Sequence, residues 1–379
     1  MTGLKDQFLL DPSVTFLNHG SFGACPKPVF DTYQKIQREL EWQPVDFLGR
    51  RADGMLAEAR AALGKYLNAD PEDLVFCMNA TLGLNTMIKS LKLEPGDEIL
   101  TTNHEYGALN NTWAFICQKT GAKYINYPMP LPVTTHADFV ERFWTGVTPR
   151  TKVIFISHIT SPTALIFPVK EICRRAREAG ILTIIDGAHV PGQIPLDLTD
   201  IDADFYSGNL HKWLCAPKGS AFFHARKSIQ KMVEPLVISH GWTDPSFIQQ
   251  NQWQGTRDIS AFLSVPAAIE FLEANNWTAV RAACHDLASE ARRQVAAMTG
   301  VAPVTPEGTE WYSQMALLAL PPETDINAFK NRLYDEFRIE IPQIDWNGWK
   351  GVRVSFQGYN TSDDLEHLLS GLQAVLGLS

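Results

Sequence analysis

The chain has 379 residues, of which 45% are hydrophobic and 20% charged, and its formal net charge is −9. This composition is typical of a soluble globular protein, and the acidic balance argues against a nucleic-acid partner, which would require clustered lysine and arginine. No apolar run of about 18 residues occurs, and the N-terminal segment lacks the basic-then-apolar pattern of a secretory signal, so we expect no membrane association.

Residues 73–225 contain apolar runs of strand length that alternate with helical segments. We expect strands at 73–79, 97–103, 122–128, 152–158, 181–188, 203–209 and 219–225, and helices at 80–91, 107–120 and 169–180. Because the runs are apolar almost throughout, the pattern predicts a mostly parallel sheet with helices on both faces. The expected fold class is therefore α/β, with the sheet sandwiched by helices.

The C-terminal part mixes helices and strands in a different way. We expect helices at 260–276, 278–299, 325–337 and from Ser362 onward, with strands at 314–320, 338–344 and 351–357. This mixture predicts a smaller α+β domain. We place the large domain at 67–262 and assign 1–66 together with 263–379 to the small, discontinuous domain.

Polar residues follow several of the predicted parallel strands directly. They are Asn79, Thr81, His104, His158, Asp186, His189 and Ser207, with Ala80 between the first two. In an open α/β sheet the carboxyl ends of the strands form the ligand-binding edge. The sequence therefore predicts a functional site at this edge.

Lys212 and Asp186 are the pair that points most directly to chemistry. Lys212 lies in "SGNLHKWLCAPKG" beside Trp213 and Leu214, an apolar setting that lowers the pKa of a lysine and suits Schiff-base formation. Asp186 closes the run "ILTIID", where its carboxylate could keep a pyridine nitrogen protonated. The alternative is a structural lysine-containing turn and an aspartate that caps a helix.

A second group of residues is suited to holding a phosphate. The backbone N–H groups of Ala80 and Thr81 lie where a strand turns into a helix, and Ser207 and His211 flank Lys212. Taken alone, "NAT" at 79–81 is more simply read as a helix N-cap. No G-x-G-x-x-G or P-loop motif occurs, so dinucleotide and ATP sites lack their main support.

The motifs "IIDGAH" and "SGNLHKW" resemble the pyridoxal 5'-phosphate (PLP) site of class V aminotransferase-fold enzymes. The resemblance runs from "TFLNHGSFG" to "VRVSFQGYNTSDDL", and "LNHGSFG" with "LGRR" is most similar to the isopenicillin N epimerase branch. It implies that Lys212 forms a Schiff base with PLP, Asp186 pairs with the pyridine nitrogen and His104 stacks on the ring. His189 would bond the phenolic oxygen. The phosphate would be held by Ala80, Thr81, Ser207 and His211.

The same resemblance implies substrate and partner contacts. Arg353 would grip the α-carboxylate of an amino-acid substrate, with Asn18 and Arg51 as further substrate-binding candidates. For Arg51 the simpler interpretation is an exposed arginine on a turn. Thr256, in "QGTRD", matches a residue that reaches the phosphate of a partner subunit, which implies a homodimer.

The six cysteines are scattered without a C-x-x-C pair, which predicts reduced thiols in a cytoplasmic protein. No H-x-x-x-H or H-E-x-x-H spacing occurs, so no metal site is expected. The segment between "EFRIEIP" and "VRVS" contains no cysteine, which disfavours cysteine desulfuration through a protein persulfide.

The residues predict an enzyme that removes the Cα proton of an amino acid, with Lys212 as base. Reprotonation from the opposite face would give epimerisation or racemisation, which the resemblance favours. Loss of a β-substituent would give a C–S lyase, and reprotonation on the cofactor an aminotransferase. The remaining alternative, a PLP-binding protein without catalysis, is disfavoured by the intact set of Lys212, Asp186, His189 and Arg353.

Overall fold

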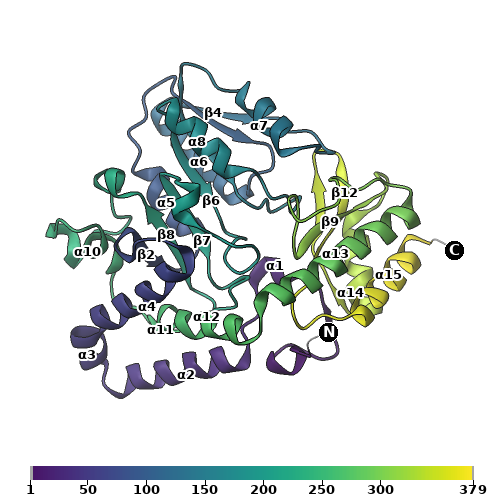
Figure 1. The fold of residues 1–379 in the computed structure, drawn as a ribbon, viewed down its shortest axis with the longest axis horizontal. Coiled ribbons are helices and arrows are strands. Elements are labelled where there is room, and N and C mark those ends of the chain that lie inside the picture. The colour runs from purple at the N-terminus through teal and green to yellow at the C-terminus, as the bar shows by residue number, and fades with distance from the viewer. Residues whose placement is uncertain (1–2, 378–379) are drawn as a thin grey trace.

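The computed structural model describes residues 3–377 and contains a seven-stranded sheet, a three-stranded sheet and a two-stranded pair (Figure 1). The strands of the large sheet are β2 (Leu74–Cys77), β3 (Glu98–Thr102), β4 (Lys123–Tyr127), β5 (Thr151–Ser157), β6 (Leu182–Asp186), β7 (Phe205–Asn209) and β8 (Ala221–Ala225). Their order is β2-β8-β7-β6-β5-β3-β4, and β8 runs antiparallel to both of its neighbours. The other pairs are parallel, which confirms the predicted α/β class.

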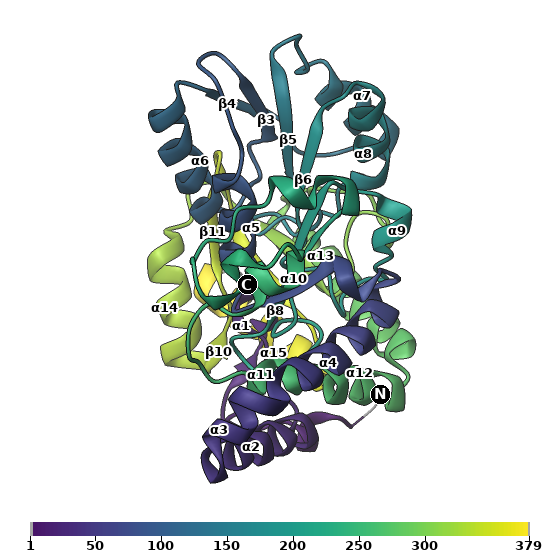
Figure 2. The ribbon, with the colours of Figure 1, turned by 90° about the vertical axis from the view of Figure 1, so that its left-hand side faces the viewer.

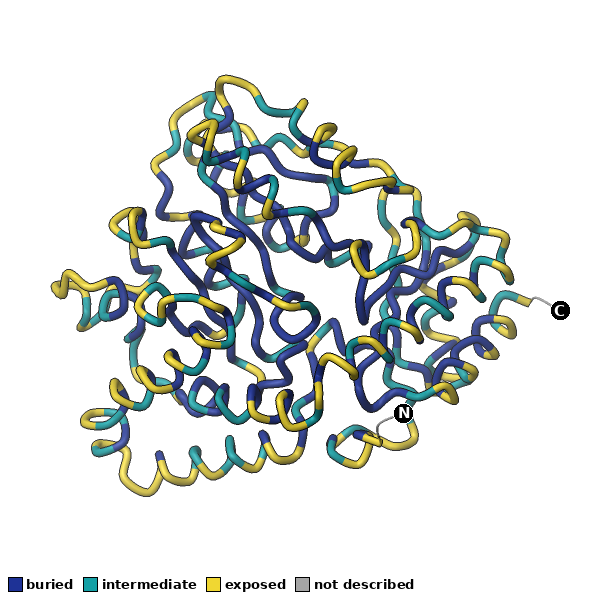
Figure 3. Tube along the Cα trace, in the orientation of Figure 1, coloured by how far each residue is buried: buried dark blue, intermediate teal, exposed yellow. Residues whose placement is uncertain are grey.

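Both faces of this sheet are buried, as the apolar runs predicted. Val153 and Phe155 of β5 pack into one hydrophobic cluster and Ile154 and Ile156 into another, because successive strand residues point to opposite faces. One cluster is covered by α5 (Ala80–Lys89), α6 (Gly107–Thr120) and α10 (Phe247–Gln252). The other is covered by α4 (Ala52–Leu67), α7 (His136–Trp144), α8 (Val169–Glu178) and α12 (Val265–Ala274). The buried strands form the dark interior in Figure 3.

The small sheet lies beside the large one and is antiparallel, in the order β11-β12-β9 (Figure 1). Its strands are β9 (Met315–Leu320), β11 (Gln343–Trp346) and β12 (Trp349–Ser355). The helices around it are α13 (Trp277–Thr299), α14 (Ile326–Phe337) and α15 (Ser362–Leu376). This arrangement confirms the smaller α+β part.

The run "RIEIPQI" was expected to be one strand, and the structure divides it in two. Ile339–Glu340 forms β10, which pairs in parallel with β1 (Thr15–Phe16), whereas β11 begins at Gln343 and pairs with β12. Pro342 lies between them and has no N–H to donate to a strand ladder. The proline therefore marks the point where the chain changes sheets.

The N-terminal segment contacts both parts of the molecule. β1 joins the C-terminal part through β10, while α2 (Lys27–Trp42) and α4 pack against α11 (Ser260–Leu263) and α12 (Figure 2). The remaining α-helices of the described residues are short: α1 (His19–Phe22), α3 (Pro44–Asp46) and α9 (Leu198–Ile201). The predicted domain boundaries at 66 and 262 stay a prediction.

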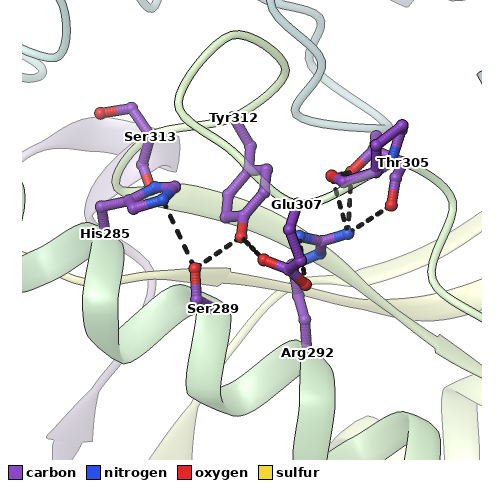
Figure 4. Close-up of polar contacts among 8 residues, drawn as sticks. His285, Ser289, Arg292, Thr305, Glu307, Tyr312 and Ser313 are labelled. Atoms are coloured by element: carbon purple, nitrogen blue, oxygen red, sulfur yellow. Dashed lines mark hydrogen bonds and ion pairs between the residues drawn. The ribbon is translucent and has the colours of Figure 1, made fainter. Parts of the chain in front are cut away.

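A buried arginine fastens the loop before β9 to α13 (Figure 4). Arg292 donates to the carbonyl and hydroxyl oxygens of Thr305 at 2.7 and 2.8 Å, and its guanidinium lies 4.0 Å from the centroid of the Tyr312 ring. Glu307 completes the cluster through an ion pair at 3.1 Å. These contacts hold the loop against the helix, away from the site described below.

Across residues 3–377, no helix is long and apolar enough to cross a membrane, and no group of three or more His, Cys, Asp or Glu residues is placed to hold a metal ion.

Candidate active site

A cavity of about 260 Å³ opens at the carboxyl edge of the large sheet, between this sheet and the loop that contains α1. We call it the central cavity. It is lined by Ser21, Phe22, Asn79, Ala80, Thr81, Tyr106, Ser157, Ile159, Ser161, Asp186, Ala188, His189, Asn209, His211 and Lys212. Ser157, Asp186 and Asn209 are the last residues of three neighbouring strands, so the site occupies the edge that the sequence predicted.

A second cavity, of about 510 Å³, lies at the opposite edge of the sheet, near Lys152 and Leu182 at the starts of β5 and β6. Its charged residues include lysines and carboxylates, and Lys92 is already paired with Glu234 at 2.5 Å. This larger cavity contains none of the residues that the sequence predicted for a functional site, so we take the central cavity as the candidate active site.

Lys212 follows β7 and faces the central cavity. Its Nζ lies 3.2 Å from Nε2 of His189. Burial, and after it the positive charge of Arg353, lower the pKa of Lys212 to about 7, while Asp186 opposes the shift. A substantial fraction of the lysine is therefore the neutral amine near pH 7, the form that can act as a nucleophile or accept a proton.

Asp186 ends β6, in the middle of the sheet, and is almost fully buried. Its Oδ1 accepts a hydrogen bond from the N–H of Ala188 at 2.9 Å. Burial raises the pKa of Asp186, and this hydrogen bond and the charge of Lys212 act in the opposite direction. Oδ2 has no protein donor among the described residues, which leaves one carboxylate oxygen available to a group in the cavity.

The predicted phosphate-binding residues are brought together in part. Thr81 and His211 line the central cavity, and the N–H of Thr81, in the first turn of α5, has no acceptor within the helix. The N–H of Ala80 is already bonded to Oδ1 of Asn209 at 2.9 Å. His211 bonds the carbonyl oxygen of Ser220 through Nδ1 at 2.9 Å.

Ser207 is not placed as the sequence interpretation required. Its hydroxyl donates to the carbonyl oxygen of Phe222 at 2.7 Å, and the nearby Gly83 of α5 covers it. Ser207 lies inside β7, whereas Asn209, two residues further on the same face, ends the strand and lines the cavity. Asn209 was missed although the expected strand at 203–209 ends there, because the interpretation selected Ser207, beside the lysine motif, instead.

His104 also lies away from the central cavity, which corrects its predicted stacking role. Its Nδ1 contacts Oγ1 of Thr163 and its Nε2 contacts the carbonyl oxygen of Met129, both at 2.8 Å. The ring centroid lies 4.2 Å from that of Trp346, deep in the protein. Tyr106, two residues later, lines the cavity and is 46% exposed. The aromatic residue at the cavity is thus Tyr106.

Arg353 extends from β12 of the small sheet to the rim of the cavity. Its guanidinium donates to the carbonyl and hydroxyl oxygens of Ser161 at 2.5 and 3.3 Å and to the hydroxyl of Ser21 at 3.3 Å. Both serines line the cavity. Burial lowers the pKa of Arg353 to about 10. Asn18 does not line the cavity. Its Oδ1 accepts a hydrogen bond at 2.5 Å from the hydroxyl of Ser21, which does line it.

Arg51 and Thr256 are outside the central cavity. Arg51 is paired with Glu39 at 2.7 Å and Asp46 at 2.8 Å and packs over Phe47, so the simpler interpretation of a surface arginine fits its position. Thr256 is exposed in the loop between α10 and α11. Its predicted contact is with a partner subunit and stays a prediction.

Glu105 is a buried acid beside the site that the sequence did not reveal. One of its oxygens accepts from the hydroxyl of Thr102 at 2.6 Å, and the other accepts from the N–H and hydroxyl of Ser157 at 2.9 and 2.6 Å. Burial raises the pKa of Glu105 to about 7, and the charge of Asp186 adds to this. Glu105 therefore orients Ser157 at the cavity wall; no local motif marks it.

Comparison with known proteins identifies the family. The family model "Aminotransferase class-V" matches residues 23–368. The chain is 34% identical to isopenicillin N epimerase of Amycolatopsis lactamdurans, over 98% of this chain and 97% of the relative. The chain belongs to the class V aminotransferase family. It is thus a PLP-dependent enzyme, which confirms the predicted family and cofactor.

Two further comparisons give the range of the family. The putative L-cysteine desulfhydrase 1 of Oryza sativa subsp. japonica is 30% identical, over 97% of this chain and 84% of the relative. The apo cysteine desulfurase of Thermococcus onnurineus NA1 has the same fold, with a TM-score of 0.83 at 19% identity, over 99% of this chain and 98% of the other. The chain is therefore similar in sequence to relatives named as an epimerase and as a desulfhydrase, and it has the fold of a cysteine desulfurase.

The residues at the central cavity fit PLP. A lysine with a lowered pKa is present for covalent attachment, and Asp186 has a carboxylate oxygen free for the ring nitrogen. His189 faces Lys212, and the first turn of α5 supplies the N–H and hydroxyl of Thr81 beside His211 for a phosphate. These groups match the three parts of the cofactor: an electrophilic aldehyde, a basic ring nitrogen and an anionic phosphate.

Proposed function

We propose that this enzyme inverts the configuration at the Cα of an amino acid or an amino-acid-bearing peptide, as an epimerase or racemase. The observation that carries this proposal is that two proton-bearing side chains, Lys212 and Tyr106, reach the central cavity from opposite sides of Asp186. Lys212 follows β7 and Tyr106 follows β3, and β6, which ends at Asp186, lies between those strands in the sheet. Inversion requires one such group on each face of Cα.

Arg353 supports this assignment by its position. After burial, the positive charge of Arg353 is the second cause of the lowered pKa of Lys212. Tyr106 in turn acts on the pKa of Arg353, which it raises against the effect of burial. The guanidinium therefore lies within electrostatic reach of both groups. A substrate α-carboxylate held by Arg353 would place Cα between the amine and the phenol.

In this proposal each residue has a distinct task. PLP, when bound, supplies an electron sink for the charge left at Cα. The neutral amine of Lys212 accepts the Cα proton on one side, and the hydroxyl of Tyr106 donates a proton on the other. Ser21 and Ser161, which bond Arg353, hold the carboxylate-binding group in place.

Replacing Tyr106 by phenylalanine tests the second-face donor. With a panel of L-amino acids in deuterated water, the wild-type enzyme is expected to give Cα-deuterated product of inverted configuration. Tyr106→Phe is expected to retain Cα exchange but to lose inversion by roughly 10²-fold, because it lacks the hydroxyl proton. NMR and chiral chromatography separate the two quantities.

Tyr127→Phe is the matched control, because its hydroxyl bonds Thr145 away from the cavity. It is expected to behave as the wild type does. Equal loss of exchange and inversion in Tyr106→Phe would contradict a specific role in the second proton transfer.

A C–S lyase reaction is the second candidate. It shares the first proton removal and is favoured by the 30% identity to the rice desulfhydrase over 97% of this chain. None of the described cysteines lines the central cavity, so the substrate's sulfur would leave directly as sulfide rather than pass to a protein cysteine as a persulfide. Release of pyruvate and sulfide from L-cysteine, without inversion at Cα, would establish this reaction in place of epimerisation.

We also propose that the enzyme acts as a homodimer in which Thr256 approaches the partner's phosphate site. The exposed loop that contains Thr256 and the exposed Trp42 and Phe22 support an interface near the cavity. Sedimentation is expected to give twice the chain mass, and Thr256→Ala to weaken PLP binding roughly 10-fold by loss of one hydrogen bond. A monomer with unchanged PLP affinity in Thr256→Ala would contradict this.

A further inference from the structure

We propose that Trp213 is a positioning residue that fixes the tautomer of His189, keeping its proton on Nε2, the ring nitrogen that faces Lys212. Nε1 of Trp213 donates to Nδ1 of His189 at 3.3 Å, and Nε2 of the same ring lies 3.2 Å from Nζ of Lys212. The inference concerns the cofactor site itself and holds whether the final product is an epimer or an elimination product.

The chemistry of the indole decides the direction of this hydrogen bond. An indole N–H is a donor and cannot accept, so Nδ1 of His189 must present its lone pair to Trp213. In a neutral imidazole the proton then lies on Nε2. Burial, followed by the positive charges of Lys212 and Arg353, lowers the pKa of His189 well below its ordinary value, so the ring stays neutral.

The fixed proton has a consequence for Lys212. An Nε2–H group can donate a hydrogen bond to the lone pair of a neutral amine. An ammonium group has no lone pair, so the two N–H donors repel each other. Hydrogen bonding to the neutral form lowers the pKa of an amine further, in the same direction as burial and Arg353. When the cofactor occupies Lys212, the same N–H is the donor that the phenolic oxygen requires.

The packing around Trp213 prevents the indole from turning away. Its side chain is fully buried, and the ring centroid of His19 lies 5.0 Å from that of Trp213. Gly192 adopts φ +93°, and a Cβ there would lie 2.2 Å from the carbonyl oxygen of Trp213. On the other side, the carbonyl of His189 accepts from Gln193 at 2.8 Å. These contacts hold the backbone of both residues, and the indole itself is buried beside His19.

The test is a ¹⁵N NMR measurement of histidine tautomers in the apoprotein and in the PLP-loaded protein, with the His189 signals assigned by their loss in His189→Gln. The wild type is expected to show the Nε2–H tautomer of His189. Trp213→Phe, which keeps an aromatic ring but lacks the N–H, is expected to show a mixture with Nδ1–H. The loaded variant is expected to lose roughly 10-fold in kcat/KM, the usual scale for an outer-shell partner.

Trp113→Phe is the matched control, because Trp113 is equally buried and its Nε1 has no acceptor among the described residues. It is expected to leave the His189 signals unchanged. A second readout is the pH profile of Lys212 acylation in the apoprotein, whose midpoint is expected to rise in Trp213→Phe. The charged groups facing the lysine, Arg353 and Asp186, are the same in both proteins.

Two results would overturn the proposal. The first is an Nδ1–H or doubly protonated His189 in the wild type. This measurement does not depend on whether any variant folds. The second is an unchanged His189 spectrum in Trp213→Phe. Because the NMR readout does not depend on turnover, failure of this proposal is distinguishable from failure of the proposed epimerase activity.

Discussion

Replacing Lys212 by alanine is expected to abolish covalent PLP attachment and to lower kcat/KM by roughly 10³-fold, the scale on which positioned acid–base and nucleophilic groups act. Lys212 lines the central cavity. Because its pKa is lowered, part of it is the neutral amine that both covalent attachment and proton removal require. The visible absorption of the bound cofactor and initial rates of Cα exchange measure the two losses separately.

Lys350→Ala is the matched control, because Lys350 is also partly buried and its Nζ donates to the carbonyl oxygen of Thr324 at 2.9 Å in the small sheet. Its cofactor spectrum and rates are expected to match those of the wild type. Wild-type absorption in Lys212→Ala would contradict the assignment.

The pH dependence of apoprotein stability gives a second readout for Lys212. Its pKa is about 7 in the folded protein and has the ordinary value of 10.5 in the unfolded chain, so between these pH values the unfolded chain binds the extra proton. The contribution of Lys212 to the free energy of unfolding therefore rises with pH across this window. The difference in unfolding free energy between wild type and Lys212→Met, measured in urea, is expected to shift in favour of the wild type as the pH rises. A pH-independent difference would contradict a lowered pKa.

Replacing Asp186 by asparagine is expected to lower kcat by roughly 10²- to 10³-fold while the protein stays folded. The amide keeps the shape of the side chain, and its oxygen can still accept from the N–H of Ala188. It cannot balance the positive charge of a protonated ring nitrogen, so the electron sink would be weakened. Steady-state kinetics with saturating PLP measure the effect, and the pH dependence of the cofactor spectrum reports the changed environment.

Asp204→Asn is a control for loss of a buried carboxylate away from the cavity. Asp204 accepts from the N–H of Thr183 at 2.9 Å and pairs with Arg226. We expect lower stability but retained kcat for the folded protein. Equal kcat losses in the two variants would indicate a general effect of buried charge and contradict a specific role for Asp186.

The predicted elements followed from the length and apolarity of the strand runs, which a sheet buried on both faces requires. Two features needed the three-dimensional structure. The antiparallel direction of β8 depends on the loop that contains Lys212, and the division of "RIEIPQI" at Pro342 depends on which sheet each half joins. Neither depends on local sequence alone.

Several of the predicted cofactor residues lie where a strand ends or in the loop or helix that follows it, and their roles stay predictions. Asp186, His189, His211, Lys212 and Thr81 all reach the central cavity. Among the residues predicted to contact the cofactor, His104 and Ser207 do not line the cavity, and each lies two positions before a residue that does, Tyr106 and Asn209. The ends of both strands were predicted to within one residue, but the apolar pattern does not show which side chain near a strand end turns toward the cavity. Buried contacts such as Trp213 with His189 connect different loops and have no local signal.

The most direct test of the account is to locate the PLP attachment in the wild-type protein. Reduction of the loaded enzyme with borohydride would make the link between cofactor and lysine permanent, and mass spectrometry of its peptides would identify the modified residue. The account predicts the mass of one reduced cofactor on Lys212, in the peptide that contains "SGNLHKWLCAPKG". Modification of a different lysine, or no modification of a fully loaded protein, would contradict it.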